Sequence, residues 1–320
     1  MSFETFDLEK QKASILSFAK SAVSNYSLEV SSLECINFEF NATFKVTTRQ
    51  GENFALRINI NSRRSSENLA AEIEFVRFLS STSEIVLPTP VALKDGSFFG
   101  SSFHADSERN LNYVLYAWLE GEEIGDRPTL SQVRGMGELM ANMHNATESL
   151  EFSRSSSLQL LRDPLWHQKD NLTSEHSFLG EVDKKKVSKV LGQIDEVIEQ
   201  LYSTGSPQPI HADLHGWNVL EHQGQLAVLD FDDCGIGYPI QDIATSLYYL
   251  DYEEQDTAFL AGYAAIREVP SYSQREMKLL LLQRRLILLN YLLETSNPEH
   301  REMAPKYLAE TIRRIDALDS

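Results

Sequence analysis

One run of polar side chains at fixed spacing constrains this chain more than any other feature. It lies in the segment PIHADLHGWNVLEHQGQLAVLDF, where His211, Asp213 and Asn218 are followed twelve residues later by Asp230. The apolar stretches NVL and QLAVL, joined by EHQG, predict two short antiparallel strands. Because the second strand returns alongside the first, we expect Asp230 to lie beside the loop that carries Asp213 and Asn218.

The order of these residues indicates a particular chemistry. Protein kinases use a loop of the form H-x-D followed by four residues and N, and then a strand that ends in a metal-binding Asp. Phosphoryl transfer needs a carboxylate that orients the attacking hydroxyl and hard oxygen ligands that hold magnesium between the nucleotide oxygens. The pattern therefore predicts Asp213 as the catalytic base, Asn218 and Asp230 as metal ligands, and ATP and Mg²⁺ as cofactors.

The same loop allows a second interpretation. His211, Asp213 and His215 alternate, and together they could bind one metal ion, as in a metallohydrolase. The chain has no further histidine pair with ligand spacing, which favours phosphoryl transfer. Taken one at a time, these residues also have ordinary explanations as turn caps or buried core side chains.

The N-terminal part of the chain has the pattern of a small β-rich lobe. A leading helix is predicted over Asp7–Tyr26, and three antiparallel strands follow, with their first connection near Asn41 and Ala42. An amphipathic helix over Leu69–Leu79 comes next. A hairpin at the turn KDGS and the strand NYVLYAWLEG complete the lobe.

Helical periodicity dominates beyond this point. It predicts three long helices, over residues 130–144, 187–202 and 276–293, interrupted by the single strand pair described above. Strands followed by helices indicate an α+β fold. We therefore expect two domains: a β-rich nucleotide-binding lobe over residues 1–118 and a helical catalytic and substrate lobe over residues 119–320.

Composition excludes several classes of function. With 29 Lys+Arg and 47 Asp+Glu, the formal net charge of -18 repels nucleic-acid backbones and anionic lipid headgroups. We expect no nucleic-acid or membrane partner. Two distant cysteines, Cys35 and Cys234, predict neither a disulfide framework nor a structural zinc site. Because MSFETFDLEKQK does not resemble a signal peptide, we predict a soluble cytoplasmic protein, and the sequence indicates no oligomeric state.

The segment from Pro209 to Ala244 resembles the aminoglycoside phosphotransferase and choline kinase family, which contains small-molecule relatives of protein kinases. In that family the loop reads H, a small residue and D and ends in N, as HADLHGWN does here, and the next strand ends like VLDF. The resemblance extends roughly from Leu33 to Leu250. The resemblance implies a two-lobed protein-kinase-like fold. It also implies Asp213 as the base and Asn218 and Asp230 as the magnesium ligands.

Positions near the N-terminus take nucleotide-binding roles from the same resemblance. FALR places Arg57 where kinases carry a phosphate-binding lysine, and Glu72 in LAAEIEFVRFL matches the ion-pair partner of that residue. The strand YVLYAWLEG resembles the hinge, whose backbone at Tyr116, Ala117 and Trp118 would bind adenine.

Two further segments resemble parts of the catalytic centre. LMANMHNAT matches a helix that would lie behind the catalytic loop, and His211 belongs to the loop motif itself. Asp242, in YPIQDIATSL, matches an acidic residue that braces the loop from the start of the next helix.

This chain also departs from the family pattern. No GxGxxG lies between the first two predicted strands, and Arg57 replaces the usual lysine. Asp232 and Asp233 follow Asp230, where they would contact a second metal or the substrate or would cap a turn. Trp166 and His167 are candidates for the wall of a substrate pocket, or for simple helix packing.

The leading prediction is transfer of the ATP γ-phosphate to a hydroxyl of a small molecule held in a cleft between the lobes. Amino alcohols, amino acids, sugars and aminoglycosides all fit. A protein Ser/Thr acceptor is the first alternative, and the lack of an APE segment after Asp230 disfavours it. The second is a catalytically silent nucleotide-binding regulator, which Arg57 and the missing glycine loop leave open.

Overall fold

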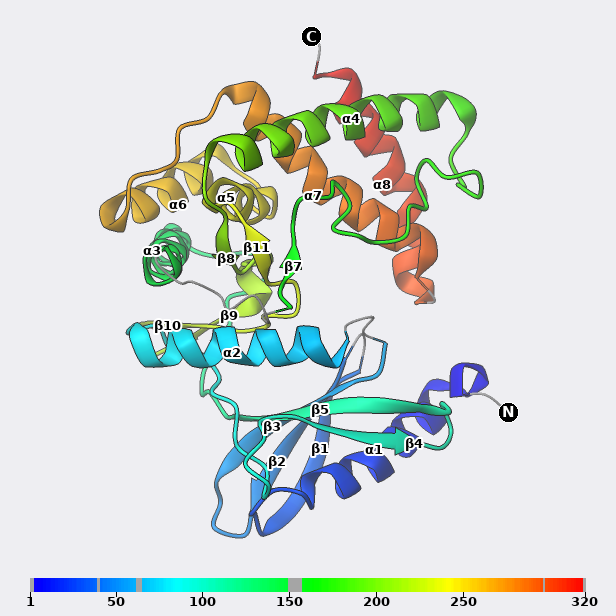
Figure 1. Ribbon diagram of the computed structural model, residues 1–320, viewed down its shortest axis with the longest axis vertical. Helices are drawn as coiled ribbons and strands as arrows, with labels where there is room; N and C mark the ends of the chain where they lie inside the picture. The colour runs from blue at the N-terminus through cyan, green and yellow to red at the C-terminus, as the bar shows by residue number, and fades with distance from the viewer. Residues whose placement is uncertain (1–2, 39–40, 62–64, 149–156, 296, 319–320) are drawn as a thin grey trace. The chain divides into compact units, whose positions relative to one another are not determined.

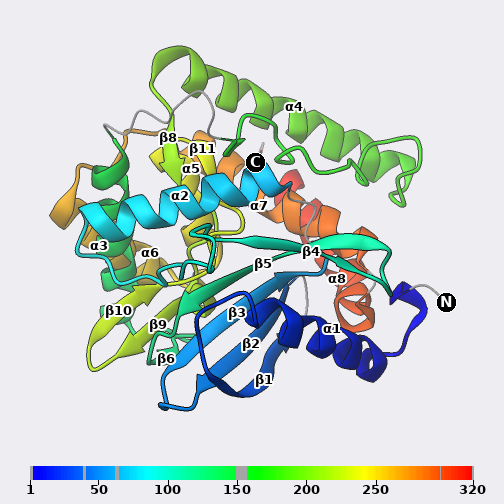
Figure 2. The ribbon, with the colours of Figure 1, turned by 60° about the horizontal axis from the view of Figure 1, so that its bottom comes forward.

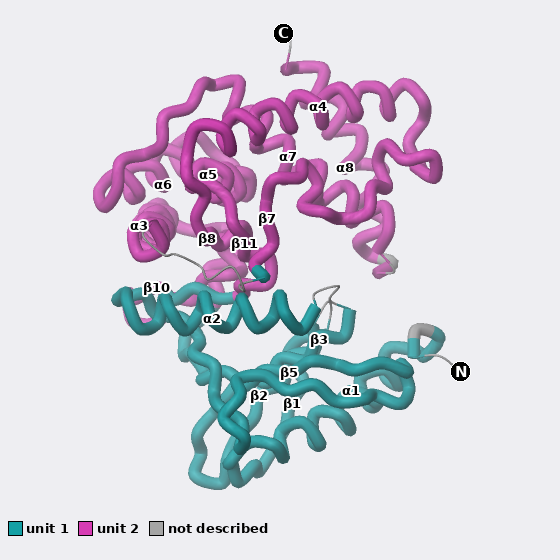
Figure 3. Tube along the Cα trace, in the orientation of Figure 1, with its two compact units in different colours: residues 1–122, 152–157, 227–229 teal, residues 123–151, 158–226, 230–320 magenta. Residues whose placement is uncertain are grey.

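The computed structural model describes residues 3–38, 41–61, 65–148, 157–295 and 297–318. The chain forms two compact units, which Figure 3 shows in different colours. Unit 1 comprises residues 1–122, 152–157 and 227–229, and unit 2 comprises residues 123–151, 158–226 and 230–320. The first is β-rich and the second mainly helical, so the fold is α+β, as predicted. The boundary predicted after residue 118 treats each domain as one continuous stretch, whereas unit 1 also includes two short later segments.

Unit 1 is built on a five-stranded antiparallel sheet with the strand order β1-β2-β3-β5-β4 (Figure 1). Its strands are β1 (Val30–Phe38), β2 (Asn41–Thr48), β3 (Asn53–Asn59), β4 (Gly100–His104) and β5 (Arg109–Ala117). In the central strand β3, Arg57 pairs with Thr43 on one side and with Val114 on the other. Hydrogen bonding on both sides fixes the backbone of Arg57 in the middle of the sheet.

Helices α1 (Leu8–Val23) and α2 (Ser66–Thr82) cover opposite faces of this sheet (Figures 1 and 2). Alternation along β5 accounts for the arrangement, because successive side chains of a strand point to opposite faces. Leu111, Tyr113 and Leu115 join the core that contains α1. Val114 and Tyr116 instead pack with Leu69 and Ile73 of α2. A short 3-10 helix, Phe3–Thr5, precedes α1.

The first strand connection, predicted near Asn41 and Ala42, falls between the end of β1 at Phe38 and the start of β2 at Asn41. Asn41 and Ala42 themselves begin β2 and pair with Asn59 and Ile58 of β3.

One local prediction for this unit, a hairpin at KDGS, is wrong. KDGS forms a turn in which the Gly96 N–H donates to the Leu93 carbonyl oxygen, but no strand directly flanks it, because α2 ends before it at Thr82 and β4 begins after it at Gly100. The hairpin of this region is β4 and β5, which turn through residues 105–108. Polar side chains throughout SSFHADSERN conceal that hairpin from an apolar pattern.

Unit 2 carries the remaining helices, which include the three predicted from periodicity. They are α3 (Leu130–Thr147), α4 (Glu181–Thr204), α5 (Pro239–Tyr248), α6 (Glu253–Ile266), α7 (Gln274–Glu294) and α8 (Pro298–Asp316). Apolar side chains of α4, α7 and α8 form the main core of the unit. None of the helices in the described ranges is apolar and long enough to span a membrane.

Helices α3 and α6 approach each other closely because glycines lie at their contact. A Cβ atom on Gly137 would lie 2.1 Å from the Phe259 carbonyl oxygen, and one on Gly262 would lie 1.9 Å from the Arg134 carbonyl oxygen. No side chain fits at such distances. The contact continues along α3 to His144, whose Nδ1 lies 2.9 Å from the Tyr263 hydroxyl of α6.

Two small sheets flank residues 211–218, the predicted catalytic loop. They contain β6 (Glu122–Glu123), β7 (Gln159–Leu160), β8 (Gln208–Ile210), β9 (Val219–His222), β10 (Gln225–Val228) and β11 (Gly235–Gly237). The predicted pair is β9 and β10, but β6 adds a third strand to it, and β7, β11 and β8 form a second sheet. Strands of two or three residues are too short to show periodicity, so the sequence did not predict them.

Candidate active site

The catalytic loop leaves β8 at Ile210 and enters β9 at Val219 after a 3-10 turn, Gly216–Asn218. Gly216 is required there, since a Cβ atom on it would lie 2.0 Å from the Gly125 carbonyl oxygen. Ala212 has a φ of 65°, a left-handed conformation that is unfavourable for a residue with a side chain. Surrounding contacts must therefore hold the loop in this shape.

Asp242 supplies those contacts. Its side chain is fully buried in the first turn of α5 and accepts hydrogen bonds from the backbone N–H groups of His211, at 3.0 Å, and Ala212, at 2.8 Å. His144 of α3 donates a third bond from Nε2, at 3.0 Å, and its Nδ1 lies 2.9 Å from the Tyr263 hydroxyl. The bracing contact that the resemblance implies for Asp242 is present, and α3 lies behind the loop as expected.

Asp213 lies at the centre of a charged network. Its Oδ1 accepts hydrogen bonds from Nη2 of Arg284 and from the Tyr249 hydroxyl, the latter at 3.3 Å, and its Oδ2 lies 3.6 Å from His215 Nε2. Burial raises the pKa of the Asp213 carboxyl, but Arg284 and His215 oppose it and hold that pKa below its ordinary value. Asp213 is therefore ionised at neutral pH and able to accept a proton.

Asn218 is fixed to the same loop. Its Nδ2 donates to the Asp213 carbonyl oxygen at 2.9 Å, so the amide oxygen points away from that bond. Asp230 follows β10, and the antiparallel pairing of β9 and β10 places it at the same end of the hairpin as Asn218. Asp230 has a φ of 55°, and its Oδ1 accepts from the Asp232 N–H at 3.2 Å.

This donor set suits magnesium. An amide oxygen and a carboxylate are hard ligands, which Mg²⁺ binds together with phosphate oxygens rather than in an all-protein cage. The described residues contain no group of three or more His, Cys, Asp or Glu side chains that could hold a metal. In particular, His211 is buried, accepts the Asp213 N–H at its Nδ1 and packs against Phe231. The metallohydrolase interpretation therefore finds no ligand set among these residues.

In unit 1 the predicted partners Arg57 and Glu72 form an ion pair. Arg57 Nη2 lies 2.5 Å from Glu72 Oε1, and the Glu72 side chain is only 1% exposed. The Tyr116 hydroxyl also donates to Glu72 Oε1, at 3.2 Å, so α2, β3 and β5 meet at this carboxylate. Pairing supplies the charge compensation that a buried carboxylate needs.

The backbone of the predicted hinge already takes part in hydrogen bonds within unit 1. The Ala117 N–H already donates to the Thr89 carbonyl oxygen at 2.8 Å. Tyr116 pairs with Ala55 in the sheet and directs its side chain to Glu72. Of the three hinge residues, Trp118 lies after the end of β5, and the Lys45 ammonium lies 4.7 Å from its ring centroid. The adenine-binding role of these residues stays a prediction.

Comparison with known proteins identifies the family. Residues 38–279, more than half of the chain, match the family model described as "Phosphotransferase enzyme family". The chain belongs to this family. The family assignment agrees with the catalytic loop, the paired Arg57 and Glu72 and the α+β fold described above.

Individual relatives of this phosphotransferase family member are distant. It is 24% identical over 237 residues to amicoumacin kinase of Bacillus subtilis (strain 168), a match that covers 67% of this chain and 66% of that protein. An uncharacterised protein of Synechocystis sp. is 26% identical over 245 residues, covering 72% of this chain and 64% of that protein. The chain thus matches just under two thirds of the length of each of these curated relatives.

Solved structures show the same fold. A microcompartment-associated aminopropanol kinase superposes with a TM-score of 0.80 at 22% identity, covering 95% of this chain and 98% of the other. An amicoumacin kinase in complex with AMP-PNP, Ca²⁺ and amicoumacin gives a TM-score of 0.78 at 21% identity, with 96% of both chains covered.

Sequence reasoning missed two contributors to the site of this family member, Tyr249 and Arg284. Arg284 belongs to the run LLLLQRRLILL. Two adjacent arginines in an apolar helical stretch imply that at least one is buried, and a buried arginine needs an acidic partner. That signal was available, but it does not indicate which carboxylate is the partner.

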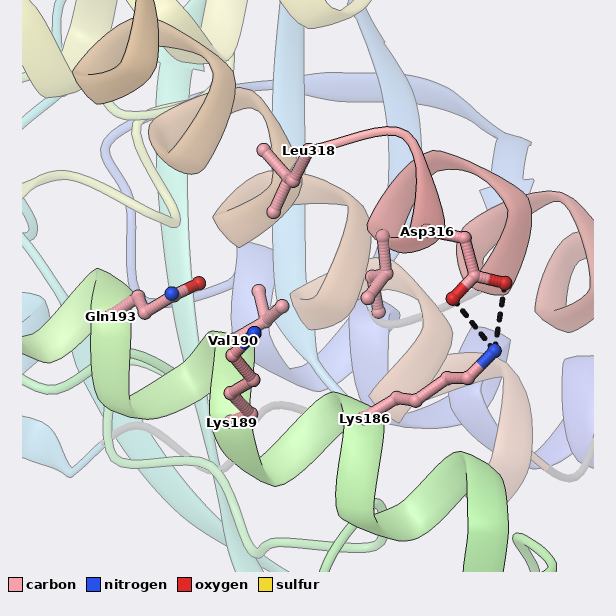
Figure 4. Close-up of a pocket in the computed structure, with 7 residues that line it drawn as sticks. Lys186, Lys189, Val190, Gln193, Asp316 and Leu318 are labelled. Carbon is pink, nitrogen blue, oxygen red and sulfur yellow. Dashed lines mark hydrogen bonds and ion pairs between the residues drawn. The ribbon is translucent and has the colours of Figure 1, made fainter. Parts of the chain in front are cut away.

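One cavity of unit 2 lies away from these residues. It has a volume of about 140 Å³ and lies between α4 and α8 (Figure 4). Lys186 reaches across its edge and binds Asp316, with N to O distances of 2.6 and 2.7 Å. None of the predicted site residues lines it, so we do not assign it to the phosphotransfer site.

Replacing Arg57 by Met tests its predicted nucleotide role. A charge-assisted hydrogen bond contributes about 1.5–3 kcal/mol, so loss of one phosphate contact should raise the KM for ATP by roughly 10- to 100-fold. Arg57→Lys should retain part of the affinity because it keeps the charge.

Steady-state kinetics at varied ATP concentration measures this effect. Arg49→Met is the control, because Arg49 also pairs with a glutamate, Glu29 at 3.9 Å, but is 73% exposed. An Arg57→Met variant that is less stable but has an unchanged KM for ATP would show that the ion pair is purely structural.

Proposed function

We propose that this protein transfers the γ-phosphate of ATP, in the presence of Mg²⁺, to a hydroxyl group of a small molecule. The observation that carries the proposal is the placement of Asp213, a carboxylate that Arg284 and Tyr249 hold on a braced loop that also carries Asn218. Family membership supports phosphoryl transfer as the reaction class. The names of the relatives, which include kinases of amicoumacin and aminopropanol, support a small acceptor.

The residues of the loop have distinct roles in this reaction. The acceptor O–H bond breaks and its proton passes to Asp213, while the acceptor oxygen forms a bond to the γ-phosphorus. The bond between that phosphorus and the bridging oxygen breaks, and its electron pair leaves with ADP. In-line transfer of this kind depends mainly on positioning. Asp213 orients the hydroxyl, and Asp242 and His144 keep the loop in place.

Asn218 and Asp230 would hold the metal ion. When bound, Mg²⁺ neutralises charge on the phosphate oxygens. The protein contributes an amide oxygen and a carboxylate on adjoining ends of one hairpin, and both belong to unit 2. Arg57, held by Glu72, would contact the nucleotide phosphates from β3.

The acceptor class that the charges favour carries an amine. The chain has a net charge of -18, and Asp233, which is 42% exposed, lies beside the network around Asp213. A negative field attracts cationic substrates and repels anionic ones. Amino alcohols and aminoglycosides therefore rank ahead of sugars and amino acids in the proposal.

A screen for ATP consumption tests the proposed function. Purified protein with Mg²⁺ should form ADP in the presence of at least one member of these classes, and phosphate should appear on the acceptor hydroxyl by mass spectrometry. ATP with Mg²⁺ should also raise the melting temperature, because a ligand at 100 times its Kd adds about 2.7 kcal/mol to the folded state. Excess EDTA and a generic protein substrate are the controls. If no acceptor is phosphorylated and ATP gives no thermal shift, the proposal fails.

A further inference from the structure

Arg284 is a buried cation in the middle of an apolar helix. Its side chain is 4% exposed, and its neighbours on α7 include Leu280, Leu286 and Ile287, all buried. Removing a guanidinium from water is unfavourable unless its charge and its donors are satisfied. Buried ion pairs often add nothing to stability compared with apolar side chains of similar volume. Stability alone is therefore a weak explanation for an arginine at this position.

The contacts of Arg284 converge on the proposed base. Nη2 binds Asp213 Oδ1, and Nη1 lies 3.3 Å from Asp233 Oδ2. Nε and Nη2 also donate to the Tyr249 hydroxyl, at 3.1 and 2.7 Å. One planar group thus holds two carboxylates and a phenol at the same time. The compact ammonium of lysine cannot match this geometry, because it lacks the rigid fork.

A strained turn places an aromatic ring near the guanidinium. The Arg284 guanidinium lies 5.4 Å from the ring centroid of Trp166 and 5.5 Å from that of Tyr249. Trp166 and His167 have φ angles of 52° and 58°, which are unfavourable for bulky residues. Asp163 Oδ1 accepts from the His167 N–H at 3.0 Å and holds the turn. Strain of this kind persists where the surrounding structure requires it, and such places are often functional sites.

These bonds distinguish the two oxygens of Asp213. Arg284 and Tyr249 both bind Oδ1, and burial raises the pKa of Tyr249, so its hydroxyl remains a donor. Oδ2 faces His215 instead. We infer that Arg284 is a positioning residue, which holds the Asp213 carboxylate by Oδ1 so that Oδ2 receives the proton of the acceptor hydroxyl. The inference rests on the proposed role of Asp213. Arg284 lies beyond residue 279, where the match to the family model ends.

The neighbouring arginine provides a matched control. Arg285 is also buried, at 6% exposure, but it binds Thr311 Oγ1 and the Tyr307 carbonyl oxygen of α8, at 2.9 and 3.2 Å. If α7 needed its arginines only for folding, Arg284→Met and Arg285→Met would affect stability and activity in parallel. If Arg284 positions the base, only Arg284→Met lowers kcat strongly.

The experiment compares both variants in the full-length protein with the acceptor found in the screen. For Arg284→Met we expect kcat to fall roughly 100-fold, as for a misplaced catalytic group, with the KM for ATP within about twofold of the wild-type value. Arg284→Lys should recover only part of the rate. Millimolar guanidinium should restore part of the rate of Arg284→Ala but not affect Arg285→Met. Should the Arg284 variants fail to fold, Tyr249→Phe removes one hydroxyl from the same network and should lower kcat several-fold.

Several outcomes would overturn the inference without affecting the proposed function. One is a kcat of Arg284→Met within threefold of wild type while Asp213→Asn is inactive. Others are equal losses in Arg284→Met and Arg285→Met, or no rescue by guanidinium in a folded Arg284→Ala. Absence of phosphoryl transfer by the wild-type protein would instead overturn both the proposed function and the inference.

Discussion

Replacing Asp213 by Asn is expected to abolish phosphoryl transfer while ATP with Mg²⁺ still stabilises the protein. The amide has nearly the same shape and keeps one oxygen for Arg284, but it cannot accept a proton. A positioned general base contributes about 10²- to 10⁴-fold to a rate, so kcat should fall by that factor. Nucleotide binding should persist, because the proposed metal ligands Asn218 and Asp230 are unchanged.

Single-turnover assays and thermal shifts measured in parallel separate the two effects. Asp316→Asn is a suitable control, since it makes the same change in an exposed ion pair of α8 with Lys186, where substitutions shift stability by about 0.5 kcal/mol or less. It should keep wild-type kinetics. An Asp213→Asn variant that phosphorylates the acceptor at the wild-type rate would show that Asp213 is not the base.

The sequence predicted those parts of the site that depend on short-range order. His211, Asp213 and Asn218 lie on one loop, and a hairpin of two short strands determines where Asp230 lies, so spacing along the chain implies proximity. The pairing of Arg57 with Glu72 was predicted only through the resemblance, and the structure forms it. The catalytic, metal-binding and nucleotide-binding roles of all the residues in these two groups stay predictions.

Contacts that depend on tertiary packing were not predictable in the same way. Arg284 and Asp213 are 71 residues apart in the sequence, and no local sequence pattern specifies a contact over such a separation. The helix predicted over residues 276–293 corresponds to α7, whose uninterrupted 21-residue run is too long for a strand. No local pattern could show that Arg284 binds the Asp213 carboxylate, the proposed base, whereas the adjacent Arg285 binds helix α8.

Strand assignments failed where apolar alternation was absent. In β4 and in the turn that follows it, polar residues dominate, so the prediction placed the hairpin at the stronger turn signal, KDGS. Strands β8 and β11 have three residues each and lie before and after the segment of residues 211–234, which contains the predicted catalytic loop. They are recognisable only by the hydrogen bonds between them. Such strands are specified by the packing around them rather than by their own composition.

Replacing Asp242 by Ala should lower both stability and activity. The substitution leaves the buried N–H groups of His211 and Ala212 without their acceptor, and it removes the partner of His144 Nε2. Breaking a buried charged network by removing one member lowers the free energy of unfolding by about 3–5 kcal/mol, a large part of the about 5–15 kcal/mol typical of a folded protein. Because Ala212 is held at a positive φ, the loop should also relax, and kcat should fall.

Ser246→Ala gives the matched comparison on the same helix. Ser246 is buried on α5 and also binds the catalytic loop, but through one neutral hydrogen bond to the Leu214 carbonyl oxygen at 2.7 Å. Its removal should lower the free energy of unfolding by about 1 kcal/mol. Urea unfolding gives the free energy of unfolding of the two variants and so shows which contact contributes more to stability. Equal losses would mean that the carboxylate of Asp242 does no more for the loop than a single hydroxyl, and the bracing role would have to be abandoned. A larger loss in Asp242→Ala, together with a reduced kcat in the fraction that remains folded, would connect the strained backbone at Ala212 to catalysis.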